Sequence, residues 1–228
     1  MVDWLAEEGL QLDVRDPARD ELPRRLVGFA GVVCLSSDVS VHDVEQYPWL
    51  LDLQRLLADA TSEQLPTLGI CLGAQLLAAA NGGRVARTER AGVGPGLVSK
   101  RDAAWQDPLF ADLPLLPDVL WLHRDTVAEL PARTVLLAAA ADSTNEAFRV
   151  GRVSYGLQFH VAATPDRLTE WVHRAPELVT DSSEWMQREV LEELQRDLWE
   201  AWRPVATQFA GLVNGTVTPA LTRRLPLR

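Results

Sequence analysis

Cys71 stands between two glycines at a point where the chain should turn from a strand into a helix. Residues 66–83, "PTLGICLGAQLLAAANGG", begin with a short apolar run and continue with leucine and alanine at helical spacing. A sharp strand-to-helix turn lifts its central side chain out of the sheet edge, and small flanking residues prevent clashes. The pattern predicts that Cys71 is a nucleophile; the alternative is a small apolar residue packed at a glycine-rich turn.

The helix expected after Cys71 would favour an ionised thiol. The N-terminus of a helix carries a partial positive charge, and the thiolate is the reactive form of cysteine. The backbone N–H of Leu72, the next residue, is the natural donor to a developing oxyanion. These features together predict covalent acyl chemistry at Cys71.

A cysteine nucleophile needs a histidine base, and the chain contains four histidines. His42 lies in a polar segment, and His173 lies in a helix that should be exposed. His123 and His160 each end an expected strand, where the sites of α/β folds gather. Between His123 and His160 the sequence pattern favours neither.

The expected elements around Cys71 alternate between helices and strands. Helices are expected over residues 2–9, 45–65, 72–83, 164–176 and in a long amphipathic segment near the C-terminus, and strands over 10–14, 27–37, 66–70, 119–125, 134–140, 147–151 and 153–160. This order predicts an α/β fold, a three-layer α/β/α sandwich around a mostly parallel, flavodoxin-like sheet. Thr164 is the expected N-cap of the helix that Pro165 opens.

The expected sheet lacks its opening strand. A doubly wound sheet begins with a strand in its middle, whereas the first element here is a helix that starts near Val2. Either the true start lies upstream or the sheet has lost a central strand. We expect an α/β domain over residues 1–175. Residues 176–228 should form a helical extension packed on that domain and end in a loose tail.

Composition excludes several classes of function. The net charge is −10 without a basic run, which argues against nucleic acid and anionic membranes as partners. The chain has no apolar stretch of about 18 residues and no signal-peptide pattern, so a cytoplasmic location is expected. Two cysteines are too few for a disulfide framework. Abundant alanine, leucine and arginine beside a single lysine suggest a bacterial source.

Neither a metal site nor a phosphate loop is expected. The histidines are scattered and the two cysteines have no paired spacing. The glycine-rich segment after residue 81 is not followed by the Gly-Lys-Ser/Thr signature of a phosphate-binding loop. We therefore expect no bound metal and no cofactor.

Four segments resemble the class I, triad-type glutamine amidotransferases, in particular the glutaminase domain of GMP synthase. Residues 69–75, "GICLGAQ", match the nucleophile motif, and residues 155–160, "YGLQFH", match the strand with the catalytic histidine. Residues 121–126, "WLHRDT", resemble the loop that helps to hold glutamine, and residues 145–151, "NEAFRVG", resemble the segment before the histidine strand. The resemblance extends from about Val2 to about Leu212.

This resemblance implies a role for each matching residue. Cys71 would attack the side-chain amide of glutamine, and His160 would be the general base and acid. The oxyanion would be held by the backbone at Leu72 and at Ser37. The implied substrate-binding residues are Gln75, Gly73, His123 and Asp125. Ammonia would leave for a separate partner protein, and a thioester would be hydrolysed.

The sequence departs from the family pattern at two places in the site. The family has a carboxylate two residues after the histidine, where this chain has Ala162; Asp166 is a candidate replacement. The turn that supplies the second oxyanion donor is of Gly-Gly-Pro type in the family, but here it reads Ser36-Ser37-Asp38.

These departures leave three hypotheses open. The first is a weakened cysteine-dependent amidohydrolase that acts on glutamine. The second is an enzyme redirected to a related γ-glutamyl amide. The third is a non-catalytic binding or partner subunit that retains only the fold.

Overall fold

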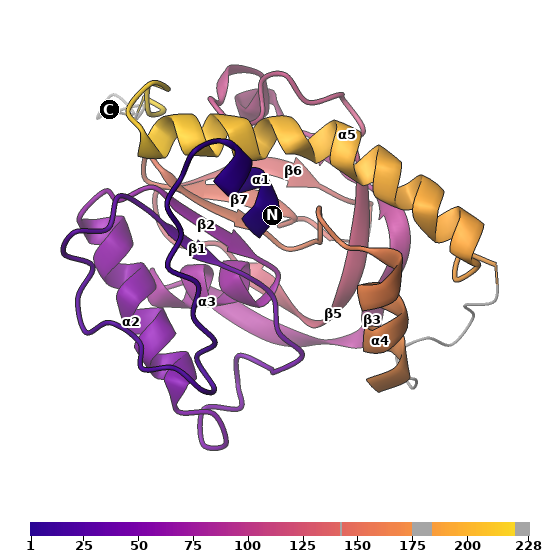
Figure 1. The fold of residues 1–228 in the computed structure, drawn as a ribbon, viewed down its shortest axis with the longest axis horizontal. Coiled ribbons are helices and arrows are strands. Elements are labelled where there is room, and N and C mark those ends of the chain that lie inside the picture. The colour runs from indigo at the N-terminus through magenta and orange to yellow at the C-terminus, as the bar shows by residue number, and fades with distance from the viewer. Residues whose placement is uncertain (142, 175–183, 222–228) are drawn as a thin grey trace, which may run out of the picture.

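A computed structural model describes residues 1–141, 143–174 and 184–221, and its centre is a six-stranded sheet in the order β1-β2-β8-β7-β6-β4 (Figure 1). A separate two-stranded sheet pairs β3 with β5. The strands are β1 (Val32–Cys34), β2 (Thr67–Ile70), β3 (Arg84–Leu97), β4 (Ser99–Lys100), β5 (Asp118–Glu129), β6 (Thr134–Ala139), β7 (Ala147–Val150) and β8 (Ser154–Leu157). The helices are α1 (Val2–Glu7), α2 (Trp49–Ser62), α3 (Leu72–Ala80), a 3₁₀ turn η1 (Asp102–Gln106), α4 (Pro165–Arg174) and α5 (Arg188–Val213).

The main sheet is mixed, so the expectation of a mostly parallel sheet needs correction. Strands β1, β2 and β8 run parallel, whereas β8–β7, β7–β6 and β6–β4 are antiparallel pairs. The physical reason is the length of the connections, because parallel neighbours need a crossover of a dozen or more residues. Only residues 151–153 join β7 to β8, which permits a hairpin and nothing longer. The α/β sandwich itself is confirmed.

Helices cover both faces of this sheet. Figure 1 shows α1 and the long α5 along one side of the strands, with α2 and α3 on the other. Side chains of β2 and β8, including Leu68 and Tyr155, join one apolar cluster with α1 and α5. Phe148 of β7 and Cys34 of β1 join a second cluster with α2 and α3. Alternating strand residues therefore build two cores, one on each face.

The β3–β5 ribbon lies against the end of β8. Leu120 of β5 and His160 exchange two backbone hydrogen bonds, with N···O distances of 2.8 and 3.2 Å. These bonds attach the ribbon to the segment that follows the histidine-bearing strand. In this ribbon β3 includes a glycine-rich stretch, which pairs with β5 through register shifts after Arg84 and Arg87.

The N-terminal segment differs from the prediction. Residues 10–14 form no strand, although Leu10 and Leu12 pack against the core. In the described chain β1 lies at an edge of the sheet and pairs only with β2. An alternating apolar pattern cannot become a strand without a neighbour for its backbone groups. The first element is helix α1, as the sequence predicts.

The structure describes the start of α4 and the packing of α5, which lie on either side of the predicted domain boundary near residue 175. Thr164 caps α4 as predicted, because its hydroxyl accepts a hydrogen bond from the Arg167 N–H at 3.4 Å. Helix α5 packs into the same apolar cluster as α1. Part of the predicted boundary near residue 175 and the predicted tail lie outside the described residues, so the division at that point stays a prediction.

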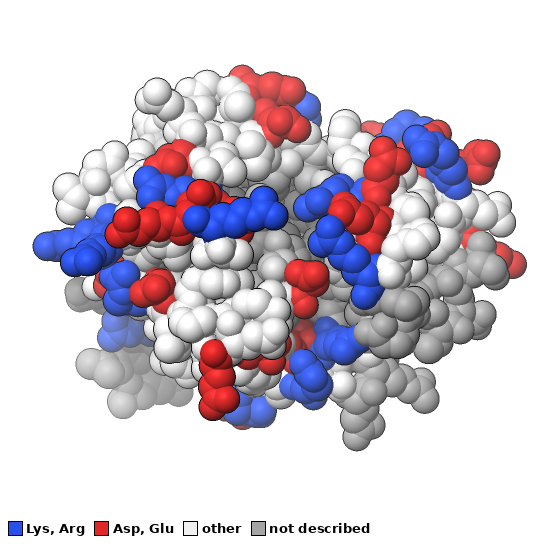
Figure 2. Space-filling view, turned by 60° about the horizontal axis from the view of Figure 1, so that its bottom comes forward, with Lys and Arg blue, Asp and Glu red and all other residues white. Residues whose placement is uncertain are grey.

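Charged side chains are mixed on the face shown in Figure 2. Lysine and arginine side chains lie among aspartate and glutamate side chains there. Among the residues drawn as described, this face carries no extended patch of one sign. This face therefore offers no extended cationic surface to a polyanion.

A substitution at Gly73 tests the close packing of α3 against β1. A Cβ atom at Gly73 would lie 2.0 Å from the Cys34 carbonyl oxygen, so a side chain must push α3 away from β1. Glycine-to-alanine changes within a helix normally gain up to about 1 kcal/mol. We expect Gly73→Ala instead to lower the free energy of unfolding by roughly 2 kcal/mol, the cost of overpacking. Urea denaturation followed by tryptophan fluorescence measures it.

Ala80→Gly, at the half-buried end of the same helix, is the matched control. It should cost no more than about 1 kcal/mol, from helix propensity alone. A Gly73→Ala variant as stable as the starting protein would contradict the close approach of α3 to β1.

Candidate active site

Cys71 occupies a strained turn between β2 and α3. Its backbone has φ 52° and ψ −105°, a conformation that non-glycine residues rarely adopt. Hydrogen bonds on both sides hold this geometry: the Cys71 N–H donates to the Leu157 carbonyl at 2.7 Å, and the Gln75 N–H donates to the Cys71 carbonyl at 3.0 Å. The chain thus has the strand–turn–helix geometry that the sequence predicts around Cys71.

The two glycines on either side of Cys71 allow this turn. A Cβ atom at Gly69 would lie 2.5 Å from backbone atoms of Gly73. A Cβ atom at Gly73 would in turn clash with the Cys34 carbonyl group. The first turn of α3 therefore lies directly on the ends of β1 and β2. Gly73 has a packing role here, and its predicted contact with substrate stays a prediction.

The Cys71 thiol is buried and neutral in this structure. The residue is 4% exposed, and Sγ donates a hydrogen bond to the Leu122 carbonyl at 3.8 Å. Burial raises the pKa of the thiol to about 11, and nearby Asp125 and Glu146 raise it further. A hydrogen bond with the Ser36 side chain and the Leu72 amide act in the opposite direction but do not offset burial.

His160 lies beside the same carbonyl group. Burial lowers the pKa of its imidazole to about 4, and nearby His123 lowers it further, while the Leu122 carbonyl raises it as a hydrogen-bond acceptor. Its Nε2 atom is buried and has no hydrogen-bond partner among the described residues. At neutral pH the site therefore holds a thiol beside a neutral imidazole, not a thiolate–imidazolium pair.

The structure does not bring Asp166 to His160. The Asp166 side chain is 84% exposed and pairs with Arg188 at 3.3 Å. It lies in the first turn of α4, where a carboxylate suits the helix dipole. Ala162, the residue where the family pattern has its carboxylate, packs against the apolar core. The replacement suggested by the sequence is therefore not formed, because α4 carries Asp166 to the surface.

The turn at residues 36–38 contacts the thiol through a side chain. Ser36 provides the hydrogen bond with Cys71 described above. Ser37 is exposed, and its hydroxyl donates to Asp38 Oδ1 at 3.3 Å. The sequence singles out the backbone of Ser37 and does not anticipate the contact from Ser36. An oxyanion role for the Ser37 backbone stays a prediction.

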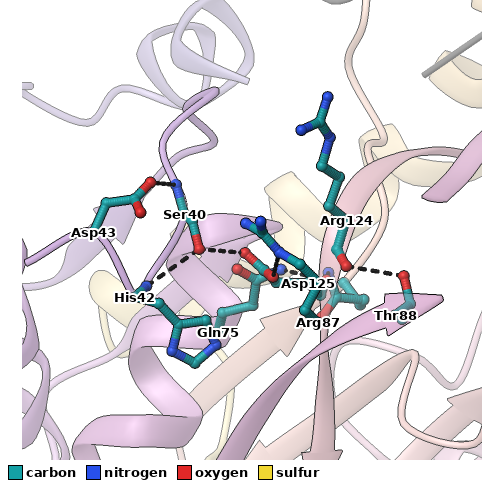
Figure 3. A network of polar contacts seen from close by, with 9 residues as sticks. Ser40, His42, Asp43, Gln75, Arg87, Thr88, Arg124 and Asp125 are labelled. Carbon is teal, nitrogen blue, oxygen red and sulfur yellow. Dashed lines mark hydrogen bonds and ion pairs between the residues drawn. The ribbon is translucent and has the colours of Figure 1, made fainter. Parts of the chain in front are cut away.

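Asp125 is the centre of a polar network that joins three elements (Figure 3). Its Oδ2 atom accepts a hydrogen bond from the Ser40 hydroxyl at 2.6 Å, and its Oδ1 atom accepts one from Arg87 Nε at 3.2 Å. Its backbone carbonyl accepts a hydrogen bond from Gln75 Nε2 at 2.7 Å. The network ties the loop after β1 to α3 and to the β3–β5 ribbon. Two predicted substrate-binding residues, Asp125 and Gln75, thus contact each other.

His123 lies near this network and is nearly buried. It is 9% exposed, and its ring lies against Gly92 of the paired strand, where a Cβ atom would come within 2.8 Å. Burial lowers the pKa of His123 to about 4, although Asp125 raises it. Neither ring nitrogen has a hydrogen-bond partner in the part of the chain that the structure describes.

Glu146 is a buried carboxyl group to which the sequence pattern gives no role. It is 0% exposed, and Oε2 accepts a hydrogen bond from Trp121 Nε1 at 2.8 Å. Oε1 has no hydrogen-bond partner among residues 1–141, 143–174 and 184–221. Burial raises the pKa of Glu146, while Ser143 and Trp121 lower it. A glutamate directly before an apolar strand is the only sequence signal at this position, and it does not distinguish a buried residue from an exposed one.

Four of the seven buried side-chain atoms without a hydrogen-bond partner among the described residues belong to His123, His160 and Glu146. Glu146 acts electrostatically on Cys71, and His123 acts on His160. Buried polar groups normally have partners, and exceptions are typical of functional sites. Two surface cavities, of about 350 and 280 Å³, lie elsewhere, on α5 and beside α2. Cys71 itself is only 4% exposed, so its thiol is closed off from solvent in this structure.

The described residues contain no group of three or more histidine, cysteine, aspartate or glutamate side chains that could hold a metal ion. None of the helices they form combines the length and the apolar character needed to cross a membrane.

The sequence profile described as "Glutamine amidotransferase class-I" matches residues 47–170, which include Cys71, His160 and the β3–β5 ribbon. The chain therefore belongs to the class I glutamine amidotransferase family.

Curated relatives are proteins named "GMP synthase [glutamine-hydrolyzing]". The protein from Thermomicrobium roseum is 37% identical over 140 residues, which are 59% of this chain and 24% of that protein. The protein from Thermus thermophilus is 37% identical over 143 residues, 61% of this chain and 27% of that protein. The matches thus span about a quarter of the length of these relatives.

Solved structures agree with this family assignment. A glutamine amidotransferase from Thermotoga maritima superposes with a TM-score of 0.78 at 25% identity, covering 93% of this chain and 90% of that one. A glutamine amidotransferase from Methylobacillus flagellatus has a TM-score of 0.77 at 23% identity, covering 98% and 92%. At that identity the second match supports the fold alone.

The two buried imidazoles predict acid sensitivity. Folding lowers the pKa of His123 and of His160 from 6.5 to about 4, so the folded state binds fewer protons than the unfolded state between these values. The free energy of unfolding should fall as the pH drops from 6.5 to about 4, by roughly 3 kcal/mol for each imidazole. Urea denaturation across this range measures the slope.

Two variants test whether His123 and His160 cause this pH dependence of the unfolding free energy. A variant with glutamine at both positions 123 and 160 should flatten the slope. His173→Gln, on the exposed end of α4, is the matched control and should retain the slope of the starting protein. Equal slopes in all three proteins would show that the buried histidines do not cause the acid sensitivity.

Proposed function

We propose that this chain hydrolyses the side-chain amide of glutamine through Cys71 and His160. The observation that carries the proposal is the backbone of Cys71, held at φ 52° with the amide of Leu72 directed at the thiol. Such strain at a buried turn is maintained only where the surrounding structure enforces it, and it clusters at active sites. His160 supplies the base beside the same Leu122 carbonyl.

The proposed reaction proceeds in two steps. Cys71 Sγ loses its proton to the His160 imidazole and forms a bond to the amide carbon. The carbon–nitrogen bond then breaks, and His160 returns the proton to the leaving nitrogen, so that ammonia departs and a thioester remains. Water attacks the thioester while His160 accepts its proton. The proton then passes to the leaving thiolate, and glutamate is released.

The oxyanion of each tetrahedral intermediate would have two backbone donors, of which the one at Leu72 is well placed and the one at Ser37 is weaker. The Leu72 N–H, at the start of α3, is one donor and adds the favourable helix dipole. The second donor would come from the backbone at Ser37, where the family pattern has glycine. A missing oxyanion donor costs roughly 10²–10³ in rate. Together with Ala162, this turn supports a weakened enzyme.

Turnover also requires the site to open. The thiol now donates to the Leu122 carbonyl, and a carbonyl oxygen in that place disfavours the thiolate. Substrate binding would have to displace this contact and provide partners for the buried polar atoms of His123 and Glu146. We propose that glutamine, or a related γ-glutamyl amide, enters as the Leu122 segment of β5 moves away.

The fate of the ammonia is part of the proposal. The relatives are named as glutamine-hydrolysing GMP synthases, and the chain matches only about a quarter of their length. We propose that the ammonia released at Cys71 passes to an acceptor enzyme on a separate partner protein. Neither a bound cofactor nor a metal takes part in the proposed steps.

A glutaminase assay tests the proposal directly. Purified protein incubated with glutamine should release glutamate at a low rate, and Cys71→Ala should reduce the release to background. Ala162→Glu should raise the rate by at least about tenfold, because a carboxylate fixes the imidazole tautomer and stabilises its charged form. Ala163→Glu, at the adjacent half-buried position, is the matched control and should give no gain. Equal glutamate release by the starting protein and Cys71→Ala would refute the proposal.

A second candidate is a non-catalytic binding or partner subunit. The neutral, buried thiol with a pKa of about 11 favours it. A glutamine-like diazoketone separates the two candidates, because an active site should give one covalent adduct at Cys71 and none at Cys34. Peptide mapping by mass spectrometry locates the adduct. An absence of labelling at Cys71 under prolonged incubation would favour the non-catalytic candidate.

A further inference from the structure

The Leu122 carbonyl is the point at which the ribbon meets the Cys71–His160 pair. It accepts a hydrogen bond from Cys71 Sγ at 3.8 Å and also acts as an acceptor for the His160 imidazole. A carbonyl oxygen stabilises the protonated thiol and opposes the thiolate. The position of this peptide group therefore acts, together with burial, to keep the Cys71 thiol protonated.

Trp121, the residue before Leu122, is held on two sides. Its indole N–H donates to Glu146 Oε2 at 2.8 Å. Its ring lies over Gly96 of the paired strand so closely that a Cβ atom there would come within 2.0 Å of the ring. Gly96 belongs to the same ribbon as Trp121, so it moves with it. Glu146 directly precedes β7 of the main sheet and therefore anchors the ribbon from outside.

Glu146 is itself fixed by backbone hydrogen bonds of the main sheet. Its N–H donates to the Ala138 carbonyl at 3.2 Å, and its carbonyl accepts a hydrogen bond from the Gln158 N–H at 2.8 Å. The carboxyl group is fully buried, and Oε2 is committed to Trp121. A continuous set of contacts thus leads from the main sheet through Glu146 and Trp121 to the Leu122 peptide.

We propose that Glu146 is a positioning residue that holds the Leu122 carbonyl against Cys71 through its hydrogen bond to Trp121, and thereby restrains the reactivity of the nucleophile. The inference rests on Cys71 being the nucleophile of the proposed function. Breaking the contact releases the Leu122 peptide, so that the thiol loses its acceptor and becomes accessible. Loss of the same contact would accompany opening of the site for substrate.

Alkylation of the full chain by iodoacetamide tests this role without glutamine. The rate at Cys71 is read by mass spectrometry of the labelled peptide, and the rate at Cys34 is read from the same samples. Cys34 is also buried, and burial raises its pKa to about 12, so it reports general loosening of the fold. Glu146→Ala should increase the rate at Cys71 by about fivefold, the factor that loss of one hydrogen bond gives, and should leave Cys34 unchanged.

Two further variants separate positioning from charge and from stability. Glu146→Gln retains an acceptor oxygen for Trp121 and should stay close to the starting protein. Trp121→Phe removes the donor and should match Glu146→Ala. Similar acceleration of both cysteines would show a merely structural role, and equal acceleration by Glu146→Gln and Glu146→Ala would show an effect of charge alone. Either result, or an unchanged rate at Cys71 in Glu146→Ala, would overturn the proposal.

The alkylation result is distinguishable from the glutaminase result. If the protein releases no glutamate but the variants change alkylation as expected, the positioning role stands and the proposed activity fails. If glutamate is released but alkylation does not change, the positioning role fails alone.

Discussion

The close approach of α3 to the ends of β1 and β2 determines the geometry of the whole site. Gly69 and Gly73 leave so little space that a Cβ atom at either would lie within 2.5 Å of backbone atoms. The chain can reverse from strand to helix in this space only if Cys71 adopts a positive φ. The strain at Cys71 is thus a consequence of packing between backbone segments, and hydrogen bonds to Leu157 and from Gln75 maintain it.

Burial then decides the protonation of the site. The ribbon brings Leu122 over the thiol and His123 beside His160, and little solvent reaches the thiol, the His123 ring or Nε2 of the half-buried His160. Desolvation disfavours every charged form, so the pKa of the thiol rises while the pKa values of both imidazoles fall. The thiol and both imidazoles are therefore neutral in this structure. Under the proposed function, activity would depend on opening of the ribbon or on a ligand that supplies the missing polar partners.

The ribbon in turn is held by polar contacts on both sides of Leu122. Asp125 binds Ser40 and Arg87 and ties the loop after β1 to the ribbon, while the Trp121 indole binds Glu146, directly before β7 of the main sheet. These anchors come from segments that are distant in the sequence. Under the proposed function, these contacts would have to loosen for the site to open.

Much of this protein follows from local sequence patterns. Alternating helices and strands predict the α/β sandwich, the glycines around Cys71 predict the strand–turn–helix geometry, and Thr164 with Pro165 predicts the start of α4. These features depend on neighbours a few residues apart, so the sequence by itself determines them.

Only the tertiary structure decided how the sheet closes and what surrounds the thiol. Residues 10–14 have the pattern of a strand but no neighbouring strand to pair with. Short connections make the β6–β7 and β7–β8 pairings antiparallel. Asp166 has the right chemistry near His160 in sequence, yet α4 carries it to the surface. Glu146 and the Leu122 carbonyl reach the site through pairings across the sheet and the ribbon. Such contacts depend on strand register and chain direction, which local composition does not encode.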